Sequence, residues 1–283
     1  MKKVKILQGS CIDKIKELED NSIDCVVSSP PYFGLRDYGV DEQFGLEKTY
    51  QDYLANTVKV FETFKPKLKD TATIWWNVGD SYHRNGSDQP LQKGLLNKEN
   101  INNRYGWDKK HKAKTKDFKP KDLMMIPNRV AIALQDAGWY IRSEIIWNKP
   151  NPMPESVKDR PTSCHEKIWL ITKNKKYFYD TEAIKEPCVT NDDTMKNKRN
   201  VWTVTSKPFK GAHFATFPKD LIEPCIKAGC PEGGVVLDPF GGSGTTGIVS
   251  ALNNRNAVLI ELNTEYVKIA EKRIENELGL FNS

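Results

Sequence analysis

A glycine-rich turn between two apolar runs near the end of the chain constrains the fold more than any other feature. The unit comprises an apolar run, the turn, a helix-forming segment, a second apolar run and a terminal carboxylate: Val235–Leu237, Asp238–Gly244, Thr245–Leu252, Ala257–Ile260 and Glu261. A strand, a turn, a helix and a second strand in this order form a βαβ unit. The pattern therefore predicts an α/β fold whose sheet is mostly parallel.

A strand near the N-terminus ends abruptly. Ile23–Ser28 is a largely apolar run without alternation, which is typical of a parallel strand buried on both faces. Ser29-Pro30-Pro31-Tyr32 follows it, and because prolines cannot continue the hydrogen bonding of a sheet, the strand must stop there. Open α/β sheets bind their ligands at the carboxyl ends of the strands. We therefore expect this S-P-P-Y loop to lie at a ligand site.

The remaining segments continue the alternation of helices and strands. Ser10 is placed to cap a short helix after the first strand, with Asp13 answering it three residues later. Hydrophobic periodicity predicts helices over Tyr50–Leu68, from Pro127 and from Thr264, and strands over Val4–Leu7, Ala72–Val78, Trp139–Trp147 and Lys167–Thr172. The polar segments 83–119 and 186–211 lack a sustained period and are predicted to be irregular insertions.

The charge of the chain is concentrated in one of these insertions. The formal net charge is +6, and the excess of Lys and Arg over Asp and Glu within residues 83–119 equals that of the whole chain. Clustered basic side chains favour a polyanionic partner, although a solvated polar loop has the same composition. The mean hydropathy is −0.61, and we find neither a membrane-spanning segment nor a secretory signal, so a cytoplasmic protein is expected. The six cysteines lack zinc-site spacing, so we expect reduced thiols and no metal site.

The glycine-rich turn is typical of a site for a cofactor that contains a nucleoside. Glycine lets the backbone approach a ligand where a Cβ atom would clash, and a carboxylate at the end of the next strand, here Glu261, accepts the ribose hydroxyls. The spacing differs from the G-x-G-x-x-G dinucleotide pattern, and no P-loop lysine follows. A cofactor without a pyrophosphate fits better, and S-adenosylmethionine is the common one. The alternative is a purely structural connection between strand and helix.

The S-P-P-Y loop has the chemistry to hold an amine on a planar ring. Pro30 has no N–H, which leaves main-chain carbonyls and the Ser29 hydroxyl as acceptors beside the aromatic ring of Tyr32. The exocyclic amine of a base is a poor nucleophile because its lone pair is delocalised, and accepting both N–H bonds favours a tetrahedral, reactive nitrogen. Tyr32 would stack on a base flipped out of its duplex. The alternative is that the prolines only end the strand.

Together the two motifs resemble the amino-group DNA methyltransferases of the β class, in which the catalytic half of the chain precedes the cofactor half. The resemblance rests on Asp24–Tyr32 and Leu237–Thr246 and extends to Asn77–Tyr82, Lys119–Leu123, Arg160–Thr162, His165-Glu166 and Phe214–Pro218. S-P-P-Y, in place of the N-P-P-Y or D-P-P-Y usual for adenine, resembles the cytosine-N4 branch. Adenine-N6 methylation is the closest alternative. A catalytically inactive DNA-binding module and a protein or RNA methyltransferase are the alternatives from other classes.

The resemblance implies a single Rossmann-like domain over residues 1–283 with a mostly parallel twisted sheet. Its catalytic half would be 1–82 and 120–185 and its cofactor half 212–283, with 83–119 and 186–211 as basic insertions that recognise DNA. The expected partner is double-stranded DNA, and a cognate restriction endonuclease is a candidate partner.

The resemblance also assigns roles to individual residues. The target base would be held by Ser29, Pro30, Pro31 and Tyr32. S-adenosylmethionine would be held by Asp238, Phe240, Gly242, Gly244, Thr245 and Glu261, with Phe214, Phe217 and Pro218 closing its methionine side. Ser10 stands where many members have an aspartate near the adenine.

Other candidate residues have plainer interpretations. Pro187-Cys188 and Pro224-Cys225 resemble the nucleophile of cytosine-C5 enzymes, but Ser29-Pro30 occupies that position at the strand edge, so these cysteines are expected to be ordinary packing residues. His165-Glu166 lacks a second metal-binding histidine and is expected to be structural. Asp80 has two interpretations: it orients the site, or it satisfies the hydrogen bonding of main-chain groups. Five tryptophans in strand-like runs are expected in the core: Trp75, Trp76, Trp139, Trp147 and Trp169.

Overall fold

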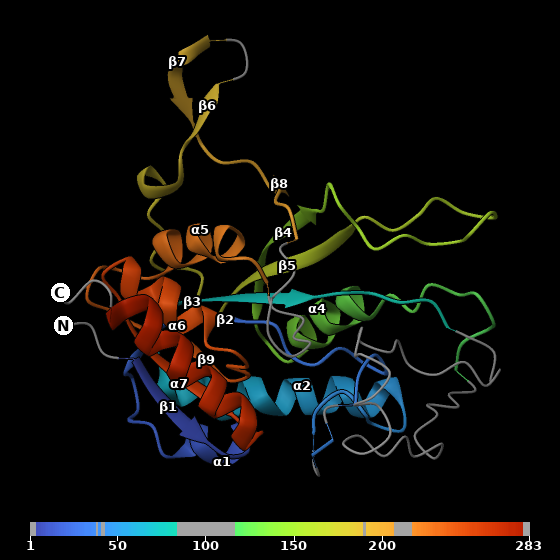
Figure 1. The fold of residues 1–283 in the computed structure, drawn as a ribbon, viewed down its shortest axis with the longest axis horizontal. Coiled ribbons are helices and arrows are strands. Elements are labelled where there is room, and N and C mark those ends of the chain that lie inside the picture. The colour runs from blue at the N-terminus through green and yellow to red at the C-terminus, as the bar shows by residue number, and fades with distance from the viewer. Residues whose placement is uncertain are drawn as a thin grey trace.

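A mixed, mostly parallel sheet forms the centre of the molecule (Figure 1). The computed structural model describes residues 4–37, 39–40, 43–83, 117–188, 191–206 and 217–279. The sheet has eight strands in the order β1-β10-β9-β2-β3-β5-β4-β8. These are β1 Val4–Gln8, β2 Ile23–Ser28, β3 Leu68–Val78, β4 Tyr140–Asn148, β5 His165–Thr172, β8 Val201–Thr203, β9 Val235–Asp238 and β10 Asn256–Glu261.

The pairing directions confirm the predicted fold class. β1, β10, β9, β2 and β3 run parallel to one another, whereas β5 runs antiparallel to both β3 and β4. β2 and β9 are adjacent although more than two hundred residues separate them, with Val26 opposite Leu237. The C-terminal ends of β2, from the first part of the chain, and β9, from the last part, therefore lie at the same edge of the sheet.

Helices cover both faces of the sheet. The helices are α1 Cys11–Lys16, α2 Tyr50–Phe64, α4 Ile126–Asp136, α5 Lys219–Gly229, α6 Thr245–Leu252 and α7 Thr264–Gly279, with 3-10 turns η1 Lys65–Lys67 and η2 Glu182–Ile184. Neighbouring strand residues enter different cores: Trp76 packs in the cluster that contains α2 and α4, and Trp75 in the cluster that contains α5. Side chains alternate across a strand, so two cores on opposite faces explain why β2 is buried along its whole length. All five tryptophans expected in the core are buried there.

Three local expectations were wrong. The helix predicted over Tyr50–Leu68 ends at Phe64, because Pro66 follows in η1 and Leu68 already belongs to β3. Helix α1 starts after Ser10 as expected, but the Ser10 side chain makes no capping hydrogen bond.

The third concerns the segment 186–211, predicted to be irregular. It forms a projecting hairpin, β6 Glu186–Cys188 with β7 Asn191–Lys196, and then β8, which extends the main sheet beside β4 (Figure 1). Apolar residues are too sparse there to set a period, although Trp202 of β8 is buried in the core that contains α5.

The two ends of the 83–119 insertion are tied together. Tyr82 and Leu123 form an antiparallel bridge, and the His83 N–H donates to the Asp122 carbonyl at 2.8 Å. Residues 84–116 lie outside the described residues, and these include most of the basic side chains expected to contact DNA.

Candidate active site

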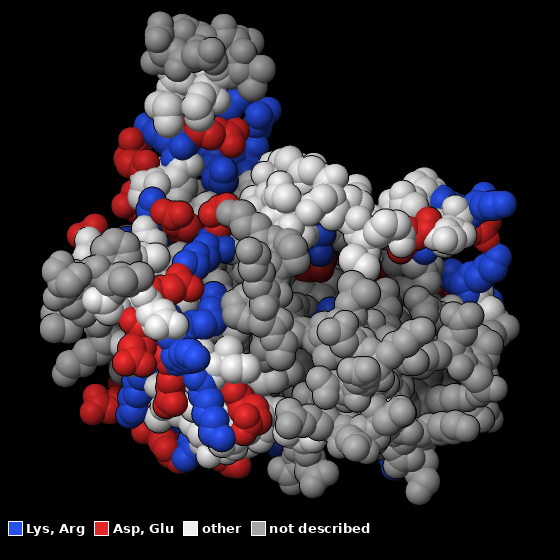
Figure 2. Space-filling model, in the orientation of Figure 1, with Lys and Arg blue, Asp and Glu red and all other residues white. Residues whose placement is uncertain are grey.

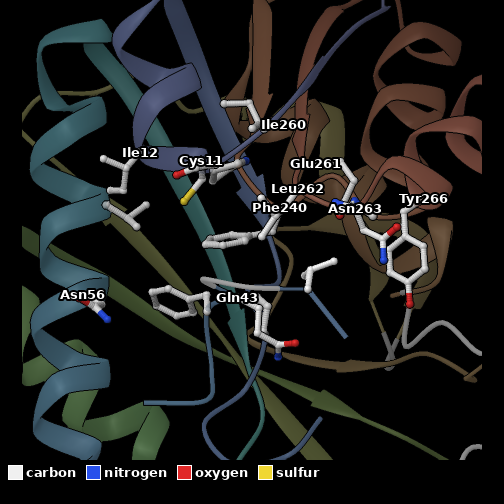
Figure 3. A pocket seen from close by; sticks show the side chains of 18 of the residues that line it. Cys11, Ile12, Gln43, Asn56, Phe240, Ile260, Glu261, Leu262, Asn263 and Tyr266 are labelled. Carbon is white, nitrogen blue, oxygen red and sulfur yellow. Dashed lines mark hydrogen bonds between the residues drawn. The ribbon is translucent and has the colours of Figure 1, made fainter. Parts of the chain in front are cut away.

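The loops that follow β2, β9 and β10 surround one cavity of about 280 Å³ (Figure 3). The cavity brings together Ser29 and Pro31 from the S-P-P-Y loop with Phe240 and Gly242 from the glycine-rich turn and Glu261 from the end of β10. Ser10 lines it as well. The S-P-P-Y loop and the glycine-rich turn, which lie about two hundred residues apart in the sequence, therefore share one crevice.

Glu261 holds the turn in shape from within this cavity. Its Oε2 atom accepts the main-chain N–H of Gly242 at 2.8 Å, and its Oε1 atom accepts that of Asn263 at 2.8 Å. Burial raises the pKa of the Glu261 carboxyl, and these hydrogen bonds oppose the rise. Gly242 adopts a φ of +51°, in the left-handed region that glycine enters without strain. The sequence thus allows the backbone N–H to point at the carboxylate.

Phe240 forms an aromatic wall between the two loops. Its ring lies 5.3 Å from that of Phe44 and 6.0 Å from that of Trp76, measured between centroids. Phe44 in turn lies 4.9 Å from Tyr53, whose hydroxyl donates to the Pro31 carbonyl at 3.2 Å. This chain of contacts fixes the S-P-P-Y loop relative to the turn.

Asp238 lies beneath the turn and does not line the cavity. Its side chain is 2 % exposed and accepts the hydroxyls of Ser28 and Thr246 at 2.6 Å each and the N–H of Phe240 at 3.1 Å. Burial raises the pKa of this carboxyl from 3.8 to about 6, against the effect of these hydrogen bonds. Asp238 therefore ties β2 to the turn and to the start of α6.

Four other residues assigned to the cofactor also lie outside the cavity lining. Gly244 packs against Ala270 of α7, and the Thr245 hydroxyl accepts a hydrogen bond from Arg273 at 3.2 Å. Phe217 and Pro218 are buried just before α5. Phe214 lies outside the described residues.

Tyr32 is held by polar partners from distant parts of the chain. Its hydroxyl donates to Glu166 Oε2 at 2.6 Å, lies 3.2 Å from Asn77 Oδ1 and accepts from the Ser29 hydroxyl at 3.2 Å. Burial, followed by the negative charge of Glu166, raises the pKa of the Tyr32 hydroxyl well above 10. Glu166 was expected to be structural, and this contact gives it a place beside the S-P-P-Y loop.

Asp80, by contrast, satisfies main-chain groups. It accepts the N–H of Ser81 at 2.9 Å and that of Ile126, at the start of α4, at 3.2 Å. Of its two readings, the geometry supports the structural one.

Sequence reasoning missed several residues that line the cavity. Asn263 and Tyr266 follow Glu261 closely, so their position after the strand was the available signal. Others come from α2 and the loop before it, where the sequence carries no motif: Gln43, Phe44, Glu47, Asn56 and Lys59. Burial raises the pKa of Glu47, while Asn56 donates to it at 3.0 Å.

No helix among the described residues is long and apolar enough to cross a membrane. In the same part of the chain, no three His, Cys, Asp or Glu side chains form a group able to hold a metal ion.

Comparison with known proteins shows the family of this chain. The sequence pattern of the N6/N4 DNA methylases matches residues 23–272, which include both loops and every strand of the eight-stranded sheet except β1. The chain belongs to the N6/N4 DNA methylase family. Methyl transfer by this family draws on S-adenosylmethionine.

Two relatives of this DNA methylase are similar to it over nearly their whole length. The type II methyltransferase M.XycI of Xanthomonas campestris pv. cyanopsidis is 47% identical over 280 residues, which cover 96% of this chain and 88% of that protein. M.SmaI of Serratia marcescens, also named a type II methyltransferase, is 46% identical over 275 residues, covering 97% of this chain and 91% of its own.

Solved structures share the fold of this methylase at lower sequence identity. The PvuII DNA methyltransferase, described as cytosine-N4-specific, superposes with a TM-score of 0.70 at 18% identity, covering 99% of this chain and 92% of its own. The complex of M1.HpyAVI with S-adenosylmethionine gives a TM-score of 0.58 at 18% identity, covering 95% and 99%.

Proposed function

We propose that this DNA methylase transfers a methyl group from S-adenosylmethionine to the exocyclic N4 amine of a flipped cytosine at a specific DNA site. The observation that carries the proposal is that the S-P-P-Y loop opens onto the cavity formed by the glycine-rich turn. Support for cytosine comes from the serine at the head of the loop and from the fold shared with a methyltransferase described as cytosine-N4-specific.

The cavity has the residues to hold S-adenosylmethionine. Glu261, Gly242 and Ser10 all line it. We assign the Glu261 carboxylate to the ribose hydroxyls, the Gly242 backbone to close approach of the cofactor, and Ser10 to the adenine. When bound, the cofactor supplies a methyl group on a positively charged sulfur. We assign Asp238, Gly244 and Thr245 to shaping the turn from behind, and Phe217 and Pro218, with Phe214, to the methionine side.

The S-P-P-Y loop would bind the amine. Ser29 Oγ and the main-chain carbonyls beside Pro30 accept the two N–H bonds, which localises the lone pair on nitrogen. An amine held there would be placed to receive the methyl group that the cofactor supplies. Pro31 lines the cavity, whereas Pro30 and Tyr32 are not among its lining residues. We assign Pro31 to fixing the loop and the ring of Tyr32 to stacking on the flipped base.

The insertions are proposed to recognise DNA. Lys196, Lys198 and Arg199 lie within 4.0 Å of Glu186 at the base of the projecting β6–β7 hairpin, and Figure 2 shows the basic side chains gathered there. Basic side chains position a protein on phosphates, and others read the bases. We assign this role to 83–119 and 186–211 and divide the rest into the catalytic segments 1–82 and 120–185 and the cofactor segment 212–283.

The type II names of the relatives support a role in restriction and modification, with a cognate endonuclease that cuts the unmethylated site.

Nucleoside analysis tests the proposed reaction. Duplex DNA is incubated with the purified enzyme and S-adenosylmethionine, digested to nucleosides and analysed by mass spectrometry. We expect N4-methylcytosine. N6-methyladenine alone would establish the adenine alternative, and a shift of duplex DNA without any methyl transfer would indicate an inactive binding module.

A further inference from the structure

Methylation of an exocyclic amine releases a proton, and the structure contains a path for it. We infer that Ser29, Tyr32 and Glu166 form a proton relay in which the Glu166 carboxylate is the final acceptor and Lys149 holds it in place. This inference rests on the proposed function, because it requires an amine at Ser29. The relay joins residues that the sequence separates by up to 137 positions.

The direction of the hydrogen bonds follows from the groups themselves. Glu166 pairs with the ammonium of Lys149 through Oε1, so its Oε2 atom can only accept, and Tyr32 must donate to it at 2.6 Å. A phenol has a single proton. The contact of 3.2 Å between Ser29 Oγ and Tyr32 Oη is therefore donated by Ser29. Both hydroxyl protons point away from the cavity, which leaves the lone pairs of Ser29 free to accept from the amine.

The transfer balances along this path. As the N–CH3 bond forms, the S–CH3 bond of the donor breaks and leaves its electron pair on sulfur, and the nitrogen becomes positively charged. One of its N–H bonds then breaks, with the electron pair returning to nitrogen. Ser29 Oγ gains that proton and passes its own to Tyr32 Oη, which passes its own to Glu166 Oε2. The result is a neutral methylated amine and a neutral carboxylic acid. A cationic exocyclic nitrogen is a strong acid, so a carboxylate is sufficiently basic to receive its proton.

Neighbouring polar groups are engaged elsewhere. Asp238 already accepts three hydrogen bonds, and Asp80 accepts from the main chain. Asn77 is a neutral amide whose nitrogen donates to the Lys167 carbonyl at 3.1 Å. The side chain of Glu166 is 18% exposed, so its proton can leave to water after each turnover.

Lys149 is a positioning residue in this relay. Its ammonium lies 4.2 Å from the centroid of the Trp147 ring, and the side chain is 19% exposed. The contact with the aromatic ring fixes the ammonium, and the ammonium fixes which carboxylate oxygen faces Tyr32.

Single-turnover kinetics with labelled S-adenosylmethionine test the relay. Glu166→Gln keeps an acceptor for Tyr32 but cannot take a proton, and Tyr32→Phe removes only the hydroxyl. We expect each to lower the methyl-transfer rate constant by about a hundredfold, within the range of general acid–base catalysis, with unchanged affinity for the cofactor. The double variant should be no slower than the slower single variant. Glu144→Gln, in the carboxylate that pairs with Lys167 on the neighbouring strand, is the matched control and should keep the wild-type rate.

A solvent isotope effect separates proton transfer from a structural role. The wild-type rate constant should be lower in D2O than in H2O, because protons move along the relay during the transfer, and Glu166→Gln should lose this difference while Glu144→Gln retains it. A wild-type rate in either Glu166→Gln or Tyr32→Phe would overturn the relay, and Tyr32→Phe decides alone if Glu166→Gln does not fold. Failure of the wild type to methylate cytosine would instead refute the proposed function.

Discussion

Removing the carboxylate of Glu261 separates cofactor binding from methyl transfer. Both its oxygens accept main-chain N–H groups at 2.8 Å, and in the proposed function they also receive the ribose hydroxyls. A hydrogen bond to a charged group stabilises a complex by about 1.5–3 kcal/mol. Loss of one such contact in Glu261→Ala should raise the Kd for S-adenosylmethionine by about ten- to a hundredfold. Isothermal titration calorimetry measures this change directly.

The same substitution also leaves two N–H groups without their acceptor. Because they border a cavity, water replaces part of the loss, and we expect the free energy of unfolding to fall by about 1–3 kcal/mol in urea titrations. The methyl-transfer rate at saturating cofactor should change little, since Glu261 accepts from Gly242 and Asn263, outside the S-P-P-Y loop. Glu265→Ala, which removes an exposed carboxylate paired with Lys268, is the control. An unchanged Kd together with lower stability would show that Glu261 only braces the turn.

Three further substitutions test other parts of the site. Ser29→Ala should cut turnover and leave cofactor affinity nearly intact, because Ser29 meets the amine; calorimetry showing an equal loss of both would contradict its acceptor role. Gly79→Ala would place a Cβ atom 2.5 Å from Tyr32 Cε2. We therefore expect the free energy of unfolding to fall by about 1–3 kcal/mol and turnover to fall more than cofactor affinity. Wild-type kinetics in this variant would show that the Tyr32 ring can move without affecting the reaction. For Asp238 the rise in pKa from 3.8 to about 6 means that the folded state favours the protonated side chain, so its contribution to stability is lost as pH rises through about 6. Urea unfolding should show a loss of about 3 kcal/mol with rising pH that is absent in Asp238→Asn; identical pH dependence in both proteins would refute this.

The fold was predictable wherever the hydrophobic pattern of a segment matched its burial in the structure. The apolar run Ile23–Ser28 forms β2 and lies between two hydrophobic cores, so its continuous apolar character reflects burial on both faces of the sheet. Thr245–Leu252 and the helix from Thr264 begin where expected because each follows a strand and a polar turn. β8 and the β6–β7 hairpin were missed because their strands are three to six residues long, too short to show a hydrophobic period, although Trp202 of β8 is buried.

The two motifs of the candidate site could be predicted from the sequence, but the residue that supports Tyr32 from behind, Glu166, could not. The pairing of β2 with β9 brings the S-P-P-Y loop to the glycine-rich turn. Glu166 reaches Tyr32 only because β5 runs antiparallel to β3, with Val78 opposite Lys167. That register is a property of the assembled sheet. A lone His-Glu dipeptide therefore looked structural.

A crystal structure of the enzyme with S-adenosylhomocysteine would test most directly whether one crevice serves both donor and acceptor. We predict that the ligand lies in the cavity with its ribose at Glu261 and its sulfur facing Ser29. Binding at another place, or a sulfur directed away from the S-P-P-Y loop, would contradict the proposed path of the methyl group.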